Sequence, residues 1–188
     1  MNKSECCTVN HLPLIERNIV LVGFMGVGKT TVGRLLAKKL YRDFIDIDAE
    51  IERTQGMSIP TLFEQYGEPY FRQLEKDHVL RESAGKMKVI SLGGGAFTQE
   101  DIRSYCLKHC LVIFLDIRFD SWQDRIHMLA GNRPILKGKS TEELQELYTA
   151  RQEAYALNHS QMHTDSLTAE EVAVYLKESL ITAYELEK

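Results

Sequence analysis

The stretch Gly23-Phe24-Met25-Gly26-Val27-Gly28-Lys29-Thr30 decides the fold of this chain. It matches the pattern G-x-x-x-x-G-K-[ST], in which a glycine-rich loop surrounds the phosphates of a nucleotide. The apolar residues 19–22 before it predict a buried parallel strand. Residues 31–40 after it carry valine and leucine at helical spacing. Strand, glycine loop and helix follow without a gap, which is the context that the motif requires.

The residues of this loop have distinct chemical roles. Glycines allow backbone N–H groups to turn toward the phosphates, and the start of the helix adds partial positive charge. Lys29 would neutralise the β- and γ-phosphates, and the Thr30 hydroxyl would ligate Mg²⁺. We therefore predict that the triphosphate of a nucleotide is held by Gly26, Val27, Gly28, Lys29, Thr30 and Thr31.

Length and composition indicate a single soluble domain. The 188 residues are 44% hydrophobic and 27% charged, which is ordinary for a globular protein with a full core. The net charge of −4 argues against nucleic acid as the main partner, because phosphate backbones attract basic faces. A few local arginines and lysines could still form a positive pocket for a small anion.

The chain carries no sign of export, membrane insertion or a zinc site. Cys6, Cys7, Cys106 and Cys110 lack the paired C-x-x-C spacing of zinc ligands. No apolar run approaches the length of a membrane span, and the first residues lack the basic and apolar regions of a signal peptide. We expect a cytoplasmic protein that does not associate with membranes.

The hydrophobic pattern predicts an α/β fold. We expect strands near 19–23, 44–47, 88–92, 111–115 and 161–164, and helices near 29–41, 49–53, 61–83, 99–108, 120–128, 142–157 and 168–184. The helix over 61–83 is expected to be interrupted near residues 67–69, and Thr168 and Glu171 are expected to form a capping box at the start of the last helix. Alternating strands and helices form a parallel sheet that is covered on both faces, and such sheets bind ligands at the carboxyl ends of their strands. Residues that directly follow the strands should therefore converge.

Asp46 and Asp48 follow the second predicted strand. One carboxylate could hold the water shell of a magnesium ion, and the other could orient or deprotonate an attacking hydroxyl. The alternative is a solvated acidic turn in which Asp48 is the N-cap of the next helix. The sequence pattern alone leaves both interpretations open.

Two further features also allow both a structural and a functional interpretation. Arg72 and Glu75 are three residues apart on a predicted helix, where they can form either a weak surface ion pair or an arginine clamp for an anion. Residues 93–95 are three consecutive glycines after a strand, a pattern that favours close backbone approach to a ligand over a simple turn. Later in the chain, Arg133 lies in a predicted mobile loop and Arg151 on the following helix, where a solvated arginine is the default interpretation.

The order of these motifs resembles the shikimate kinase family. The shared pattern is the P-loop, D-x-D, F-R-x-x-E, the triple glycine, R-P in a lid and R-x-x-x-Y on a late helix, and it covers roughly residues 18–180. The resemblance implies a nucleoside-monophosphate-kinase-like three-layer sandwich with a five-stranded parallel sheet of order 2-3-1-4-5. It also implies transfer of the γ-phosphoryl group of ATP to the 3-hydroxyl of shikimate, on the route to chorismate and aromatic amino acids.

The resemblance assigns roles residue by residue. Lys29 and the loop amides would hold the phosphates of ATP, and Thr30 would ligate Mg²⁺ while Asp46 acts through water. Asp48 would bind the hydroxyls of shikimate and accept the proton. The carboxylate of shikimate would be held by Arg72 and Arg151, beside Gly94 and Gly95, and Arg133 would be the catalytic lid residue that also reaches ATP.

The resemblance also implies a domain organisation. We expect a tail over 1–17 and a single kinase domain over 18–188, with a substrate-binding region near 47–85, a lid near 129–140 and a monomeric state. The lid has only one arginine, and Arg125 is displaced from the usual adenine-stacking position, which weakens the assignment of an adenine site.

Two other functions remain as hypotheses. A gluconate kinase of the same fold would leave the D-x-D, F-R-x-x-E and triple-glycine motifs together unexplained. A catalytically inactive regulatory homologue would be expected to lack Lys29, Asp48, Arg72 or Arg133, and all four are present.

Overall fold

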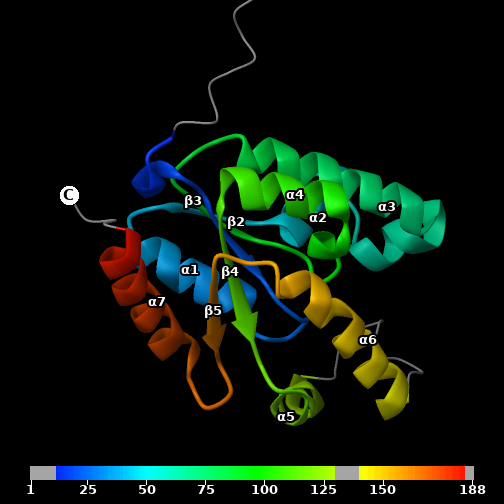
Figure 1. Ribbon diagram of the computed structural model, residues 1–188. Coiled ribbons are helices and arrows are strands. Elements are labelled where there is room, and N and C mark those ends of the chain that lie inside the picture. Colours follow the sequence, from blue (N-terminus) through cyan, green and yellow to red (C-terminus); the bar gives the residue numbers. More distant parts are fainter. Residues whose placement is uncertain (1–11, 130–139, 185–188) are drawn as a thin grey trace, which may run out of the picture.

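A five-stranded parallel sheet organises the protein (Figure 1). The computed structural model describes residues 12–129 and 140–184. Its strands lie in the order β2-β3-β1-β4-β5, as predicted. The strands are β1 (Ile19–Val22), β2 (Asp43–Asp46), β3 (Lys88–Ser91), β4 (Leu111–Asp116) and β5 (Ser160–His163). The helices are α1 (Lys29–Lys39), α2 (Ile47–Gln55), α3 (Ile59–Ser83), α4 (Glu100–His109), α5 (Phe119–Leu129), α6 (Thr141–Tyr155) and α7 (Ala169–Tyr184), with short 3₁₀ segments η2 (Leu14–Glu16) and η3 (Ala96–Thr98).

The centre of the sheet is apolar on both faces. Every residue of β1 is buried, and so are the first five residues of β4, which pairs with it in parallel register from Ile19–Leu111 to Val22–Phe114. Helices α1 and α7 pack together on one side of the sheet, and α3 and α4 pack together on the other (Figure 1). Because both faces are covered, ligands have access only at the ends of the strands.

The second strand ends earlier than predicted. Ile47 was expected in the strand, but β2 ends at Asp46 and α2 begins at Ile47. The Asp46 carboxylate accepts a hydrogen bond of 3.2 Å from the backbone N–H of Ala49, so Asp46 is the N-cap of α2. The alternative that made Asp48 the N-cap is therefore wrong. Asp48 lies in the first turn of the helix instead.

The long helix α3 is interrupted, as the sequence predicts. Ser58 caps its start by accepting from the N–H of Thr61, and Gly67 has φ 78° and ψ 171°, outside the helical region. Pro69 follows this break and cannot donate to the preceding turn. The half of α3 that follows the break carries Arg72 and Glu75, so the interruption sets the direction from which both side chains approach the sheet.

Residues 12–17, which belong to the predicted tail, are described by the structure and contact the rest of the chain. Residues 14–16 form η2, and the guanidinium of buried Arg42 donates to the carbonyls of Ile15 and Arg17, each at 2.5 Å. These bonds attach part of the expected tail to the start of β2. Most of the predicted lid, including Arg133, lies outside the described residues. Within the described part of the chain, no helix has the length and apolar character needed to cross a membrane.

Candidate active site

The P-loop connects the carboxyl end of β1 to α1. Gly26 and Gly28 have φ values of 79° and 101°, which residues that carry a side chain rarely adopt. A Cβ atom on Gly23 would lie 2.4 Å from the carbonyl oxygen of Leu115, so this glycine allows the loop to cross the end of β4. The Lys29 ammonium donates to the carbonyls of Gly23 and Phe24, at 2.8 and 3.0 Å. The loop thus holds its lysine beneath the space where phosphates would lie.

Thr30 and Asp46 meet at the edge of this space. The Thr30 hydroxyl donates to the Asp46 carboxylate at 2.6 Å, although the two residues belong to different strand–helix connections. A hydroxyl and a carboxylate are hard oxygen ligands of the kind that Mg²⁺ prefers. The donor set therefore fits the predicted magnesium site.

Asp48 lies in the first turn of α2, two residues after Asp46, and is close to Gly93. A Cβ atom on Gly93 would be 2.6 Å from Asp48 Oδ1. Burial of the carboxyl group and repulsion from Asp46 raise the pKa of Asp48 to about 6, against the opposing attraction of Lys29 and Arg72. A carboxylate with a pKa near neutrality can accept a proton during a reaction and release it afterward.

Arg72 is held by two carboxylates. Glu75, which is only 1% exposed, accepts from Arg72 Nη1 at 2.7 Å, and Glu68 accepts from Nη2 at 3.0 Å. Glu75 has a second hydrogen-bond partner, Gln99, whose amide donates at 2.8 Å to the same carboxylate oxygen. Burial raises the pKa of Glu75, against the attraction of Arg72. Glu75 is therefore buried and Arg72 partly exposed, so the pair is not an ordinary surface ion pair, and its role as a clamp for an anion stays a prediction.

Arg151 reaches the same region from α6. Its guanidinium carbon lies 5.4 Å from the centre of the Phe24 ring, and burial lowers its pKa. Among the residues that the structure describes, it forms no ion pair. The default interpretation as a solvated helix arginine does not hold, because Arg151 is a partly buried cation that faces the P-loop.

The three glycines meet these side chains one after another. Gly93 lies against Asp48 and Glu75, Gly94 against Arg151, and Gly95 against Arg72, whose Nη1 would be 2.8 Å from an added Cβ. The sequence predicted a ligand contact here. The structure adds that the triplet makes room for the charged side chains that surround the ligand space.

Three residues that contribute to the site were not predicted from the sequence. Gln99 supports Glu75, the Tyr155 hydroxyl donates to the carbonyl of Gly94, and Trp122 Nε1 donates to the carbonyl of Met25 at 2.7 Å. Burial raises the pKa of Tyr155 to about 12, so its hydroxyl remains a donor. Only Tyr155 had a signal in the sequence, as the last residue of R-x-x-x-Y.

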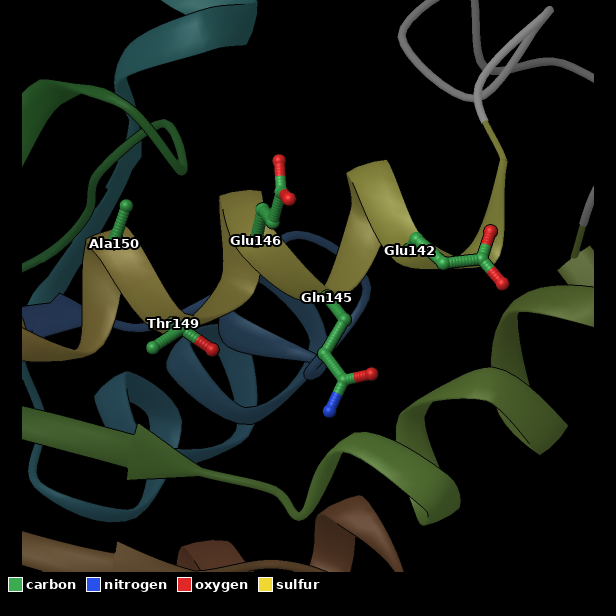
Figure 2. Close-up of a pocket in the computed structure, with 5 residues that line it drawn as sticks. All are labelled: Glu142, Gln145, Glu146, Thr149 and Ala150. Carbon is green, nitrogen blue, oxygen red and sulfur yellow. The ribbon is translucent and has the colours of Figure 1, made fainter.

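The P-loop, the carboxylates of Asp46 and Asp48 and part of the glycine triplet line one cavity, whereas Arg72, Arg151 and Gly95 are not among the residues that bound it. It measures about 420 Å³ and is bounded by Met25, Gly26, Gly28, Lys29, Thr30, Thr31, Asp46, Asp48, Ser91, Leu92, Gly93 and Gly94. A second, more open hollow of about 490 Å³ lies along α6 (Figure 2). Among the residues that the structure describes, its lining comes from that helix and includes Glu142 and Glu146 but no cation, so this part of the lining offers no complement to a phosphate or carboxylate. We place the active site at the first cavity.

Similarity to known proteins agrees with this geometry. The family model for shikimate kinase matches residues 25–181. A shikimate kinase from Bacillus pumilus (strain SAFR-032) is 52% identical over 177 residues, which cover 93% of this chain and 95% of the relative. The solved structure of a shikimate kinase from Acinetobacter baumannii in complex with shikimate has a TM-score of 0.82 and 36% identity, and covers 95% of this chain and 97% of its own. A gluconokinase from Sinorhizobium meliloti 1021, at 15% identity, covers 93% of this chain and 96% of its own with a TM-score of 0.60, and shares only the fold.

Proposed function

This chain belongs to the shikimate kinase family and is an ATP-dependent phosphotransferase, and from that premise we propose how its side chains share the reaction. The acceptor is shikimate, and the γ-phosphoryl group of ATP passes to its 3-hydroxyl on the route to chorismate. One observation carries the proposal: the P-loop lysine and Asp48 line the same cavity, and Arg151 meets the wall of that cavity at Gly94. We further propose a cytoplasmic monomer.

The P-loop holds the donor. The backbone N–H groups of residues 26–31 and the Lys29 ammonium bind the β- and γ-phosphates, with the positive end of α1 directed at them. Thr30 would ligate Mg²⁺ directly, and Asp46 would act through water ligands of the ion. When bound there, Mg²⁺ neutralises phosphate charge.

Two arginines bind the carboxylate of the acceptor. Arg72 is aimed by Glu75 and Glu68, and Arg151 lies beside Gly94. Planar guanidinium groups suit a carboxylate because each can donate two parallel hydrogen bonds. Gly94 and Gly95 allow the substrate ring to approach the backbone. The carboxylate is thus fixed at one end, which leaves the hydroxyls near Asp48.

Asp48 accepts the proton of the reacting hydroxyl. A bond forms between the 3-oxygen of shikimate and the γ-phosphorus, the bond from that phosphorus to the β–γ bridging oxygen breaks, and ADP leaves. The proton of the hydroxyl passes to Asp48, whose pKa of about 6 keeps most of the group ionised at neutral pH. Arg133, outside the described residues, would close over the phosphates as part of a lid and exclude water.

Coupled measurement of ADP release tests this function. We expect Mg²⁺-dependent release with shikimate and none above background with gluconate, and phosphorus NMR should place the new ester at the 3-hydroxyl. Turnover of gluconate, or ADP release that shikimate does not stimulate, would refute the proposal in favour of the gluconate kinase or the inactive homologue.

A further inference from the structure

Phe24 is part of the P-loop, but its side chain is buried away from the phosphate space. Its ring is 1% exposed and packs edge-on against two aromatic residues from other helices. The ring centres of Trp122 and Tyr148 lie 5.1 and 5.3 Å away, at interplanar angles of 71° and 78°. Both contacts have the T-shaped geometry that aromatic pairs favour. The ring is therefore fixed, and the role described above for the P-loop does not account for it.

The Phe24 ring supports the guanidinium of Arg151. The distance from the guanidinium carbon to the ring centre is 5.4 Å, within the range of a cation–π interaction. On another side Arg151 meets Gly94, where an added Cβ would lie 3.2 Å from Nη1. The arginine is thus positioned between the donor loop and the glycine triplet.

The two arginines of the acceptor site are held by different means. Arg72 is bound by the carboxylates of Glu68 and Glu75, which offset its charge, whereas Arg151 has no acidic partner among residues 12–129 and 140–184. The negative face of an aromatic ring orients a guanidinium but accepts no hydrogen bonds from its in-plane N–H groups. Apart from a hydrogen bond to the Tyr155 hydroxyl, those N–H groups remain available to an anionic ligand, and no ion pair with a described carboxylate offsets the charge, although Glu75 attracts it from a distance.

We propose that Phe24 is a positioning residue for the acceptor: its ring orients Arg151 toward the carboxylate of shikimate and leaves its charge uncompensated. The inference rests on the proposed role of Arg151 in binding that carboxylate. The same loop that binds the phosphates of ATP then carries the support of an acceptor-binding residue.

Substitution of the ring by an aliphatic side chain tests the proposal. For Phe24→Leu we expect a KM for shikimate about threefold to thirtyfold higher, which is the range of a partly desolvated cation–π contact. The KM for ATP should change by less than about twofold. Phe24→Met, whose unbranched and flexible side chain can fill an irregular space, should give the same split if Phe24→Leu folds poorly.

Phe44→Leu is a matched control. Arg34 lies over the Phe44 ring at 5.7 Å, so the variant removes a similar cation–aromatic pair outside the acceptor site. It should leave the KM for shikimate unchanged. A rise equal to that of Phe24→Leu would mean that general loosening of the fold causes the effect, which would overturn the proposal.

A double-mutant cycle and a substrate analogue give measurements that would not change if Phe24 had only a structural role. Phe24→Leu should add little to the KM of Arg151→Ala, because the ring acts through the arginine. The preference for shikimate over its uncharged methyl ester, expressed as a ratio of kcat/KM, should fall in both single variants. Additive effects, or an unchanged preference in Phe24→Leu, would overturn the proposal.

The single variants distinguish a failure of the proposed role of Arg151 from a failure of the proposed role of Phe24. If Arg151→Ala leaves the KM for shikimate unchanged, Arg151 does not bind the carboxylate, and the proposed role fails together with the inference. If Arg151→Ala raises that KM and Phe24→Leu does not, only the inference about Phe24 fails.

Discussion

Replacement of Asp48 by asparagine should stabilise the folded protein while it removes turnover. The carboxylate lies against Gly93 and near Asp46, and these surroundings raise its pKa from 3.8 to about 6. A carboxyl group that binds protons more tightly in the folded state makes folding less favourable once it is ionised. Asparagine has nearly the same shape without the charge, so the variant should avoid this cost.

The pKa shift sets the size of the effect. A rise of about two units corresponds to about 3 kcal/mol at about 1.4 kcal/mol per unit, which is an upper limit because Asp48 is partly exposed. Attraction between the charge and the N-terminus of α2 opposes it by about 0.3–1 kcal/mol. We expect a gain of about 1–3 kcal/mol in the free energy of unfolding, or roughly 2–10 °C in Tm for a chain of this size.

The gain should depend on pH in one direction. Below about pH 3.8 the carboxyl group is neutral in both states, and the wild-type protein and Asp48→Asn should be equally stable. Ionisation in the unfolded chain begins near that pH, so the advantage of the variant should grow up to about pH 6. Above the folded-state pKa the difference should be constant.

Thermal unfolding of both proteins at pH 4, 6 and 8 measures this difference. Asp43→Asn, at an exposed position at the start of β2, is the control and should leave Tm unchanged at each pH. The reasoning is refuted if Asp48→Asn is no more stable than wild type at pH 8, or if its advantage is the same at pH 4. Turnover should fall by about 10²–10⁴, the usual contribution of a general base.

Three further predictions follow from the same contacts. In wild type, kcat/KM for shikimate should fall about tenfold per pH unit below about pH 6, because the proton acceptor is then neutral, and a pH profile that stays flat to pH 4.5 would contradict this role of Asp48. Arg72→Ala should raise the KM for shikimate far more than the KM for ATP, and steady-state kinetics that showed the reverse would assign Arg72 to ATP. The same variant should lower the free energy of unfolding, measured by denaturant, by about 3–5 kcal/mol because Glu75 is left buried without its partner. In Gly95→Ala the new Cβ would lie 2.8 Å from Arg72 Nη1 and displace it, so steady-state kinetics should again show a higher KM for shikimate, whereas Gly85→Ala, which meets only the flexible end of Lys88 within 3.4 Å, should behave as wild type.

Local patterns predicted the parts of the fold that neighbouring residues control. The apolar runs of β1 and β4, the interruption of α3 at Gly67 and the capping box of Thr168 and Glu171 all occur as expected. Each depends on residues a few positions apart. The one-residue error at β2 has a local cause as well, because the Asp46 side chain begins α2 as soon as the strand ends.

The sequence by itself therefore determined the P-loop, the succession of strands and helices and, through the order of the motifs, the family. Tertiary structure alone decided the state of the charged groups. The pattern around Arg72 and Glu75 was compatible with a weak surface pair, but the Glu75 carboxylate is buried because Gly93 and Gln99 lie against it, while Gly95 lies against Arg72. The pKa of Asp48 and the exposure of Arg151 likewise depend on residues far away in the chain. Burial and electrostatics arise from what surrounds a group in space, which residue spacing does not specify.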